Sequence, residues 1–175
     1  MTQYSKRMVI IHWLTLALLI AAWLLGENLA EATDDNKATL AGYIVHLLAG
    51  GAILLLTVTR LISRSKDGTP PAMGQTLMDK VAKGIHHALY TVLFVLPISG
   101  VLTVITSDAG KALLAGDVNL LPKKDGYEHV FAHEVHEVLV TVLIALVVVH
   151  LLGAIKHQFI MKDGLMKRMS LRRTN

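Results

Sequence analysis

Four long apolar stretches alternate with short polar connections along the chain. They cover residues 8–26, 40–63, 85–106 and 133–157, and each is close to the length that a helix needs to cross a bilayer. Hydrophobic residues occupy 53% of the 175 positions, so little chain remains for a separate soluble domain. The pattern predicts an all-α membrane protein, a single domain built as a bundle of four transmembrane helices.

The polar connections contain residues that end helices. The first helix is expected to end near Gly26, with residues 27–37 forming a polar loop, and Pro70 and Pro71 interrupt the chain after the second stretch. Residues 75–84 are expected to form a separate short interfacial helix before the third stretch. Trp13, Trp23 and Tyr43 lie near stretch ends and are expected in the aromatic belt at the lipid interface.

Basic residues are concentrated on one side of the predicted bundle. Thirteen of the 17 Lys and Arg residues lie before the first helix, between the second and third or in the last turn of the second, or in the last turn of the fourth and beyond it. Because loops rich in Lys and Arg stay in the cytoplasm, both termini of the multi-pass chain are expected there. These charges are expected to contact lipid headgroups and not nucleic acid. The opposite side carries ten acidic residues against four basic ones.

Four histidines lie inside the apolar stretches, where an ionisable side chain is costly and usually serves a function. By depth, His12 and His150 belong near the cytoplasmic side, whereas His46 and His136 belong near the outer side. His136 and His150 are 14 positions apart, which corresponds to about 21 Å along one helix face. The only pairing that depth allows is His12 with His150 and His46 with His136.

Paired imidazoles point to haem, because neutral imidazole is an axial ligand of haem iron. The chain has no cysteine, which excludes covalent c-type attachment, iron–sulfur clusters and Cys-ligated zinc. Two haem b groups, each with two histidine ligands, are therefore expected. Gly50, one turn from His46, is expected to clear space for a macrocycle, although ordinary helix packing explains it equally well.

Further candidates lie toward the cytoplasmic side. His86 and His157 are expected at one level, where they either form an inner redox or quinone site or are simply solvated helix ends. Arg60 and Arg7 are candidates to pair with haem propionates, and the alternative is that they anchor helix ends at the lipid surface.

Several short motifs follow one another along nearly the whole chain. They are Ile11-His12-Trp13, the His46 helix ending in Thr59-Arg60-Leu61, the Thr69-Pro70-Pro71 loop, His86 with Tyr90 and Pro97, and His136, His150 and His157 on the last helix. In this order the chain resembles the bacterial cytochrome b561 family of small, four-helix, di-haem inner-membrane proteins. The resemblance implies the same two ligand pairs, and a quinone site near His86 and His157.

The resemblance also implies a function. It implies a quinone-linked oxidoreductase, since members of this family carry electrons to or from quinone and some oxidise superoxide on the periplasmic side while reducing ubiquinone. We therefore expect electron transfer between a periplasmic one-electron donor, superoxide among the candidates, and membrane ubiquinone.

Two alternatives and the question of assembly stay open. One alternative is a cytochrome b subunit that anchors a larger redox enzyme, such as a hydrogenase or a formate dehydrogenase. The other is a metal-ion transporter, which is disfavoured because such proteins gather ligands near the midplane, often with carboxylates. Assembly as a homodimer is also left open.

Overall fold

The computed structural model describes residues 3–35, 37–71, 74, 76–123, 126–127 and 129–172. Four long helices account for most of the chain: α1 (Lys6–Asp34), α2 (Leu40–Asp67), α3 (Leu77–Thr106) and α5 (Phe131–Ile155). Each is long and apolar enough to span a membrane, the last together with the turn that follows it. The predicted all-helical bundle with four transmembrane-length helices is confirmed.

Local signals define where these helices begin. The Thr39 hydroxyl accepts a hydrogen bond from the Gly42 amide at the start of α2. At the start of α3, Thr76 and Asp79 form a reciprocal capping box, in which each side chain bonds the backbone of the other. Pro97 lies inside α3, which continues through it.

Two predicted boundaries are wrong. α1 does not end near Gly26 but continues to Asp34, because residues 27–32 are mostly good helix formers and a polar sequence does not by itself end a helix. Likewise, Leu77–Gly84 is no separate interfacial helix, because the capping box starts a helix that runs on without interruption as α3.

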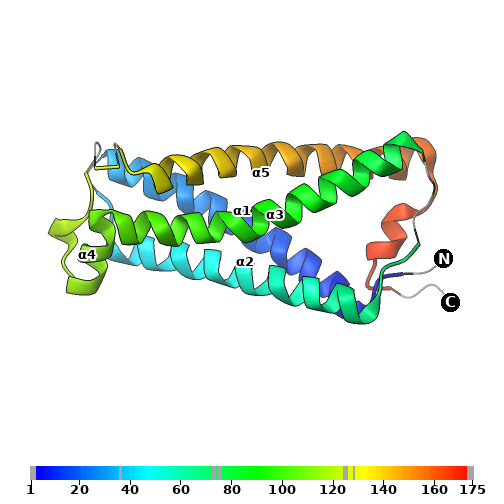
Figure 1. The fold of residues 1–175 in the computed structure, drawn as a ribbon, viewed down its shortest axis with the longest axis horizontal. Coiled ribbons are helices and arrows are strands. Elements are labelled where there is room, and N and C mark those ends of the chain that lie inside the picture. The colour runs from blue at the N-terminus through cyan, green and yellow to red at the C-terminus, as the bar shows by residue number, and fades with distance from the viewer. Residues whose placement is uncertain are drawn as a thin grey trace.

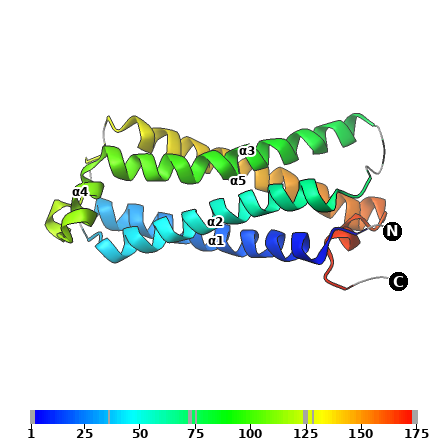
Figure 2. The ribbon, with the colours of Figure 1, turned by 60° about the horizontal axis from the view of Figure 1, so that its bottom comes forward.

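The long helices associate as two pairs, α1 with α2 and α3 with α5, and α2 also packs on α3 (Figures 1 and 2). A middle core cluster joins α2, α3 and α5 through Ile53, Val92, Leu93 and Leu143. Both termini lie at one end of the bundle, here called the termini end (Figure 1). The short helix α4 (Asp108–Ala115) lies at the opposite end, here called the α4 end.

The connection between α3 and α5 is partly helical. It contains α4 and the short 3-10 turn η1 (Val118–Leu120), and Ala109 and Ala112 of α4 pack with Tyr43 in a second core cluster. Gly116 ends α4 in the left-handed conformation that glycine adopts easily. This segment closes the α4 end of the bundle.

The chain after α5 folds back over the termini end. It forms the π-helical turn η2 (Lys156–Met161) and the 3-10 turn η3 (Leu165–Met169). The Tyr4 amide donates to the Arg168 carbonyl at 3.2 Å, and the Trp13 indole donates to the Met169 carbonyl at 3.0 Å. These bonds hold the C-terminal segment against the start of α1.

Candidate functional site

The four intramembrane histidines form two pairs at two levels of the bundle. The ring centres of His12 on α1 and His150 on α5 are 6.3 Å apart, with 70° between the ring planes. The ring centres of His46 on α2 and His136 on α5 are also 6.3 Å apart, with 75° between the planes. The structure therefore brings together the same two pairs of histidines that their depths along the helices predict.

This spacing fits a metal centre held between two imidazoles. A ring nitrogen lies about 2 Å from a bound metal and about 1 Å from its own ring centre, so two ligand rings on opposite sides have centres about 6 Å apart. Two imidazole rings that only pack against each other are not held to this distance, whereas two rings that bind one metal are. Both pairs therefore have the separation that a bis-imidazole haem iron needs.

A serine fixes the orientation of His136. The Ser99 hydroxyl donates its only hydrogen to the Leu96 carbonyl at 2.7 Å. Its oxygen lies 3.0 Å from His136 Nδ1 and so accepts the Nδ1 hydrogen of the ring. This leaves Nε2 unprotonated, which is the tautomer that binds a metal.

Glycines give the His46–His136 pair its space. A Cβ on Gly26 would lie 3.1 Å from Cε1 of His46, and a Cβ on Gly100 would lie 3.1 Å from Cε1 of His136. An almost wholly apolar cavity of about 180 Å³ adjoins both rings. Its walls are formed by His46, Leu47, Gly50, Gly51, Leu54, Pro97, Ile98, Gly100, Val101 and His136. The structure thus places Gly50 in the wall of this cavity.

The His12–His150 pair has a different, charged environment. Arg60 Nη1 lies 2.9 Å from His12 Nδ1, and the guanidinium also lies over the Tyr90 ring at 5.6 Å. Arg60 Nε is buried and finds no hydrogen-bond partner among the described residues. The His86 ring lies 5.2 Å from that of His150. Arg7, the other propionate candidate, instead forms a surface ion pair with Asp67 at 2.8 Å.

His157 lies nearer the end of the bundle than His86. Its Nδ1 is 2.5 Å from an Asp163 carboxylate oxygen, and this hydrogen bond lowers the pKa of Asp163. No hydrogen bond, ion pair or ring contact between described atoms joins His86 to His157. The structure therefore associates His86 with the His12–His150 pair and His157 with the C-terminal segment.

Two tyrosines meet beside the His46–His136 pair. The hydroxyls of Tyr43 and Tyr127 are 2.7 Å apart, and the Tyr127 ring stacks on His133 at 4.3 Å. Tyr43, expected in the lipid-facing belt, is only 4% exposed because α4 packs over it. Burial and the hydrogen bond with Tyr43 raise the pKa of Tyr127 above the ordinary value of a phenol.

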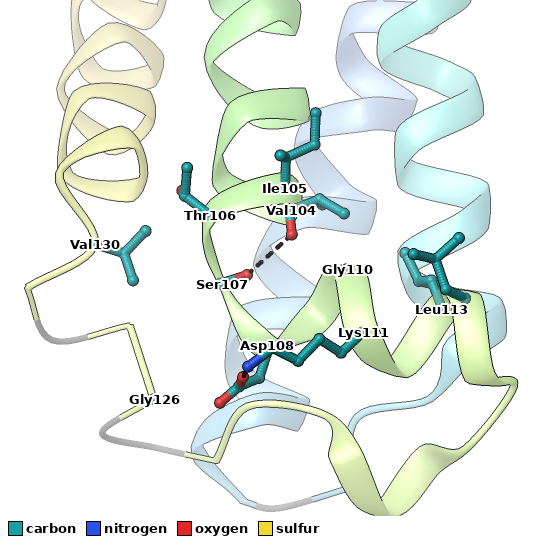
Figure 3. Close-up of a pocket in the computed structure, with 11 residues that line it drawn as sticks. Val104, Ile105, Thr106, Ser107, Asp108, Gly110, Lys111, Leu113, Gly126 and Val130 are labelled. Atoms are coloured by element: carbon teal, nitrogen blue, oxygen red, sulfur yellow. Dashed lines mark hydrogen bonds and ion pairs between the residues drawn. The ribbon is translucent and has the colours of Figure 1, made fainter.

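A larger cavity of about 590 Å³ opens at the α4 end (Figure 3). It is lined by Val104, Ile105, Thr106, Ser107, Asp108, Gly110, Lys111, Leu113, Leu114, Gly126 and Val130. Lys111 pairs with Asp108 at 2.7 Å, which raises the pKa of Lys111. None of the four paired histidines lines this cavity.

Sequence reasoning missed several residues that shape the paired sites. Ser99, Gly26, Gly100 and Tyr127 were not predicted as site residues, and Gly26 was expected only to end the first helix. A serine in the middle of an apolar stretch is itself a signal, because a polar side chain there needs a partner. The glycines carry no comparable signal, since glycine is common in membrane helices.

Comparisons with known proteins agree with the geometry. A family model described as "Prokaryotic cytochrome b561" matches residues 3–170. Cytochrome b562 of Cereibacter sphaeroides is 28% identical over 170 residues, covering 95% of this chain and 94% of the relative. The probable superoxide oxidase CybB of Yersinia pestis is 27% identical, covering 95% of each chain. Cytochrome b561 homolog 1 of Escherichia coli K12 is 23% identical, covering 99% of each.

Proposed function

The chain belongs to the prokaryotic cytochrome b561 family, and on that premise we propose that it is a di-haem b protein that passes electrons across a membrane. Its four spanning helices make it a multi-pass membrane cytochrome. The observation that carries the proposal is the equal 6.3 Å spacing of the two histidine pairs. The pairs share α5 and lie about 21 Å apart along it, as two carriers in series require.

Each pair would hold one haem b through its two imidazoles, which leave no iron position open. Haem held in this way supplies reversible one-electron transfer. The contribution of the chain is to fix the ligands and exclude water. Ser99 holds His136 in the ligating tautomer, and Gly26 and Gly100 let the helix backbones approach the rings.

Arg60 is suited to bind a haem carboxylate. An arginine only donates hydrogen bonds, so His12 Nδ1 accepts from Arg60 in this structure and its hydrogen lies on Nε2. Ligation through Nε2 needs the opposite tautomer, so the guanidinium must turn away from His12 when the iron is bound. The buried Nε without a described partner supports a propionate as its acceptor.

We place both termini in the cytoplasm because thirteen of the 17 basic residues lie on the termini side. In a bacterial inner membrane this makes the His46–His136 site the outer, periplasmic site and the His12–His150 site the inner one. Electrons would enter at the outer site from a one-electron donor and leave from the inner site to membrane ubiquinone.

The name of the Yersinia relative supports superoxide as a donor. Quinone reduction also needs protons, and His86 and His157 lie on the proposed cytoplasmic side as the candidates to relay them. His86 lies beside the inner ligand His150, as a residue between a haem and a quinone would.

Exposed apolar residues on the outer connection favour a second candidate, the anchor subunit of a larger redox enzyme. Leu114 is 93% exposed, and Val118 and Leu120 are about half exposed. A peripheral subunit docking there would cover them. Co-purification of a haem-bearing or metal-bearing partner from the native membrane would favour this role.

Haem content and spectra of single-ligand variants test the proposal. The purified protein should contain two haem b groups per chain, and His46→Ala and His150→Ala should each lose a different one. His87→Ala is the matched control, because its ring bonds the Lys83 carbonyl and belongs to neither pair. Absence of haem from the intact protein, or loss of the same haem in both variants, would overturn the proposal.

A further inference from the structure

The Tyr43–Tyr127 pair flanks both ligands of the outer site. Tyr43 precedes His46 by three residues on α2, one turn nearer the α4 end. Tyr127 stacks on His133, which precedes His136 by three residues on α5, again one turn nearer the α4 end. The two hydroxyls therefore meet on the water-facing side of the His46–His136 pair.

The hydrogen bonds around the two phenols show that one phenol hydrogen lacks a strong acceptor. The Thr33 hydroxyl donates to the Leu29 carbonyl at 2.8 Å, so Tyr43 must be the donor in its 3.5 Å contact with Thr33. One phenol donates to the other across the 2.7 Å contact, and either can be the donor. The second phenol hydrogen has at best the 3.5 Å contact from Tyr43 to Thr33, which is at the limit of a hydrogen bond, so one hydrogen of the pair is available to a better acceptor.

A carboxylate is the acceptor that this position favours. The propionates of a haem are ionised, and ionised groups avoid the bilayer centre, so those of the outer haem would face the α4 end. At the inner site, the Arg60 guanidinium is the group suited to pair with a propionate charge. Among the described lysines at the α4 end, Lys37 and Lys111 are held in exposed ion pairs with Asp35 and Asp108, and Lys123 is an exposed loop residue with no described contact to His46 or His136.

We propose that the Tyr43–Tyr127 pair donates a hydrogen bond to a propionate of the outer haem, with one phenol bonding the carboxylate and the other holding that phenol in place, so that both act as positioning residues of that site. This inference rests on the proposed di-haem function. A neutral phenol shares the carboxylate charge without cancelling it, whereas Arg60 supplies a full positive charge at the inner site. Reduction adds negative charge, so the inner haem is then the easier to reduce, and the transfer step from the outer haem to the inner one is favoured.

The test is potentiometric titration of the purified holoprotein, with the two haems assigned from His46→Ala and His150→Ala. Tyr43→Phe and Tyr127→Phe keep the rings but remove the hydroxyls. Each should lower the midpoint potential of the outer haem and shift its pH dependence to higher pH, because the propionate loses a donor and binds protons more tightly. The inner haem should not change. Tyr4→Phe, which removes a hydroxyl at the termini end, is the matched control.

A second readout separates this role from a structural one. The propionate bending bands in the resonance Raman spectrum report hydrogen bonding to the carboxylates directly, and they should shift for the outer haem alone. Unchanged bands and an unchanged outer midpoint in both variants would overturn the inference, even if thermal stability fell. If the intact protein contains two haems and the tyrosine variants change neither potential nor Raman bands, the di-haem function is kept and only this inference is lost. If the intact protein contains no haem, both the di-haem function and this inference are overturned.

Discussion

Gly100 and the ring of His136 approach so closely that a Cβ on Gly100 would lie 3.1 Å from the ring Cε1. Gly26 stands in the same relation to His46, on the other side of the outer site. At both positions a methyl group would displace the ligand ring by a few tenths of an ångström or separate the helices. Ligand placement at this site is therefore set by backbone approach as well as by side-chain contacts.

Gly100→Ala should remove or weaken the outer haem while the inner haem stays bound. Overpacking at such a contact costs about 1–3 kcal/mol, and the strain falls on the ligand ring itself. Haem per chain and the reduced-minus-oxidised spectrum of the purified variant measure the effect. Gly84→Ala is the matched control on the same helix, because a Cβ there has no neighbour within 4 Å among the described atoms. Two haems with wild-type spectra in Gly100→Ala would contradict the prediction.

Ser99→Ala should weaken the outer haem without disturbing the fold. The serine oxygen accepts the Nδ1 hydrogen of His136 and so keeps Nε2 free for the iron. Loss of such a supporting contact typically costs about 10–100-fold in affinity. Haem retention during stepwise dilution with a competing apoprotein measures this change. Ser99→Thr keeps the hydroxyl and should restore retention, and equal retention in the alanine variant and the wild type would show that the contact is unimportant.

Arg60→Gln should lower the midpoint potential of the inner haem. The guanidinium places a positive charge at the inner site, where the proposed propionate contact keeps it near the haem, and a positive charge favours the reduced state. Arg60→Lys keeps the charge but loses the planar guanidinium, so it should restore only part of the potential. Potentiometric titration of both variants measures the difference. The expectation fails if the glutamine variant has a wild-type inner midpoint, or if only its outer midpoint moves.

Much of the bundle and the pairing of its histidines could be predicted because both depend on position along helices. Apolar length gave the four spans, and a separation of 14 residues put His136 and His150 on one face of one helix. Depth then left one partner for each. None of this required knowledge of how the helices are rotated about their axes.

Contacts between helices could not be predicted, because they depend on how each helix is rotated about its axis. Whether Gly26 or Gly100 faces a ligand ring depends on rotation and crossing angle, which one sequence does not specify. Tyr127 lies outside the spans and reaches Tyr43 only because the segment before α5 returns to the start of α2. Helix ends were misjudged where polar residues continue a helix, as in α1 up to Asp34.

Asp163 connects the end of the bundle to the C-terminal segment, and its charge should stabilise that connection. One carboxylate oxygen bonds His157 at 2.5 Å, and the other accepts from the Leu165 amide at 2.9 Å. The hydrogen bond from His157 and that from the Leu165 amide hold the pKa of Asp163 below its ordinary 3.8. A carboxyl whose pKa is lower in the folded state contributes stability above the ordinary value, and loses it as the pH falls through the lowered one.

Asp163→Asn should therefore lower the thermal midpoint of the detergent-purified protein at pH 7, and the deficit should shrink as the pH falls below the ordinary carboxyl pKa and vanish below the lowered pKa of Asp163. Asp35→Asn is the control, because Asp35 forms only an exposed ion pair with Lys37, and such pairs contribute little. Its thermal midpoint should match the wild type at every pH. A deficit in Asp163→Asn that persists unchanged at low pH would show that the carboxylate charge is not what holds the C-terminal segment in place.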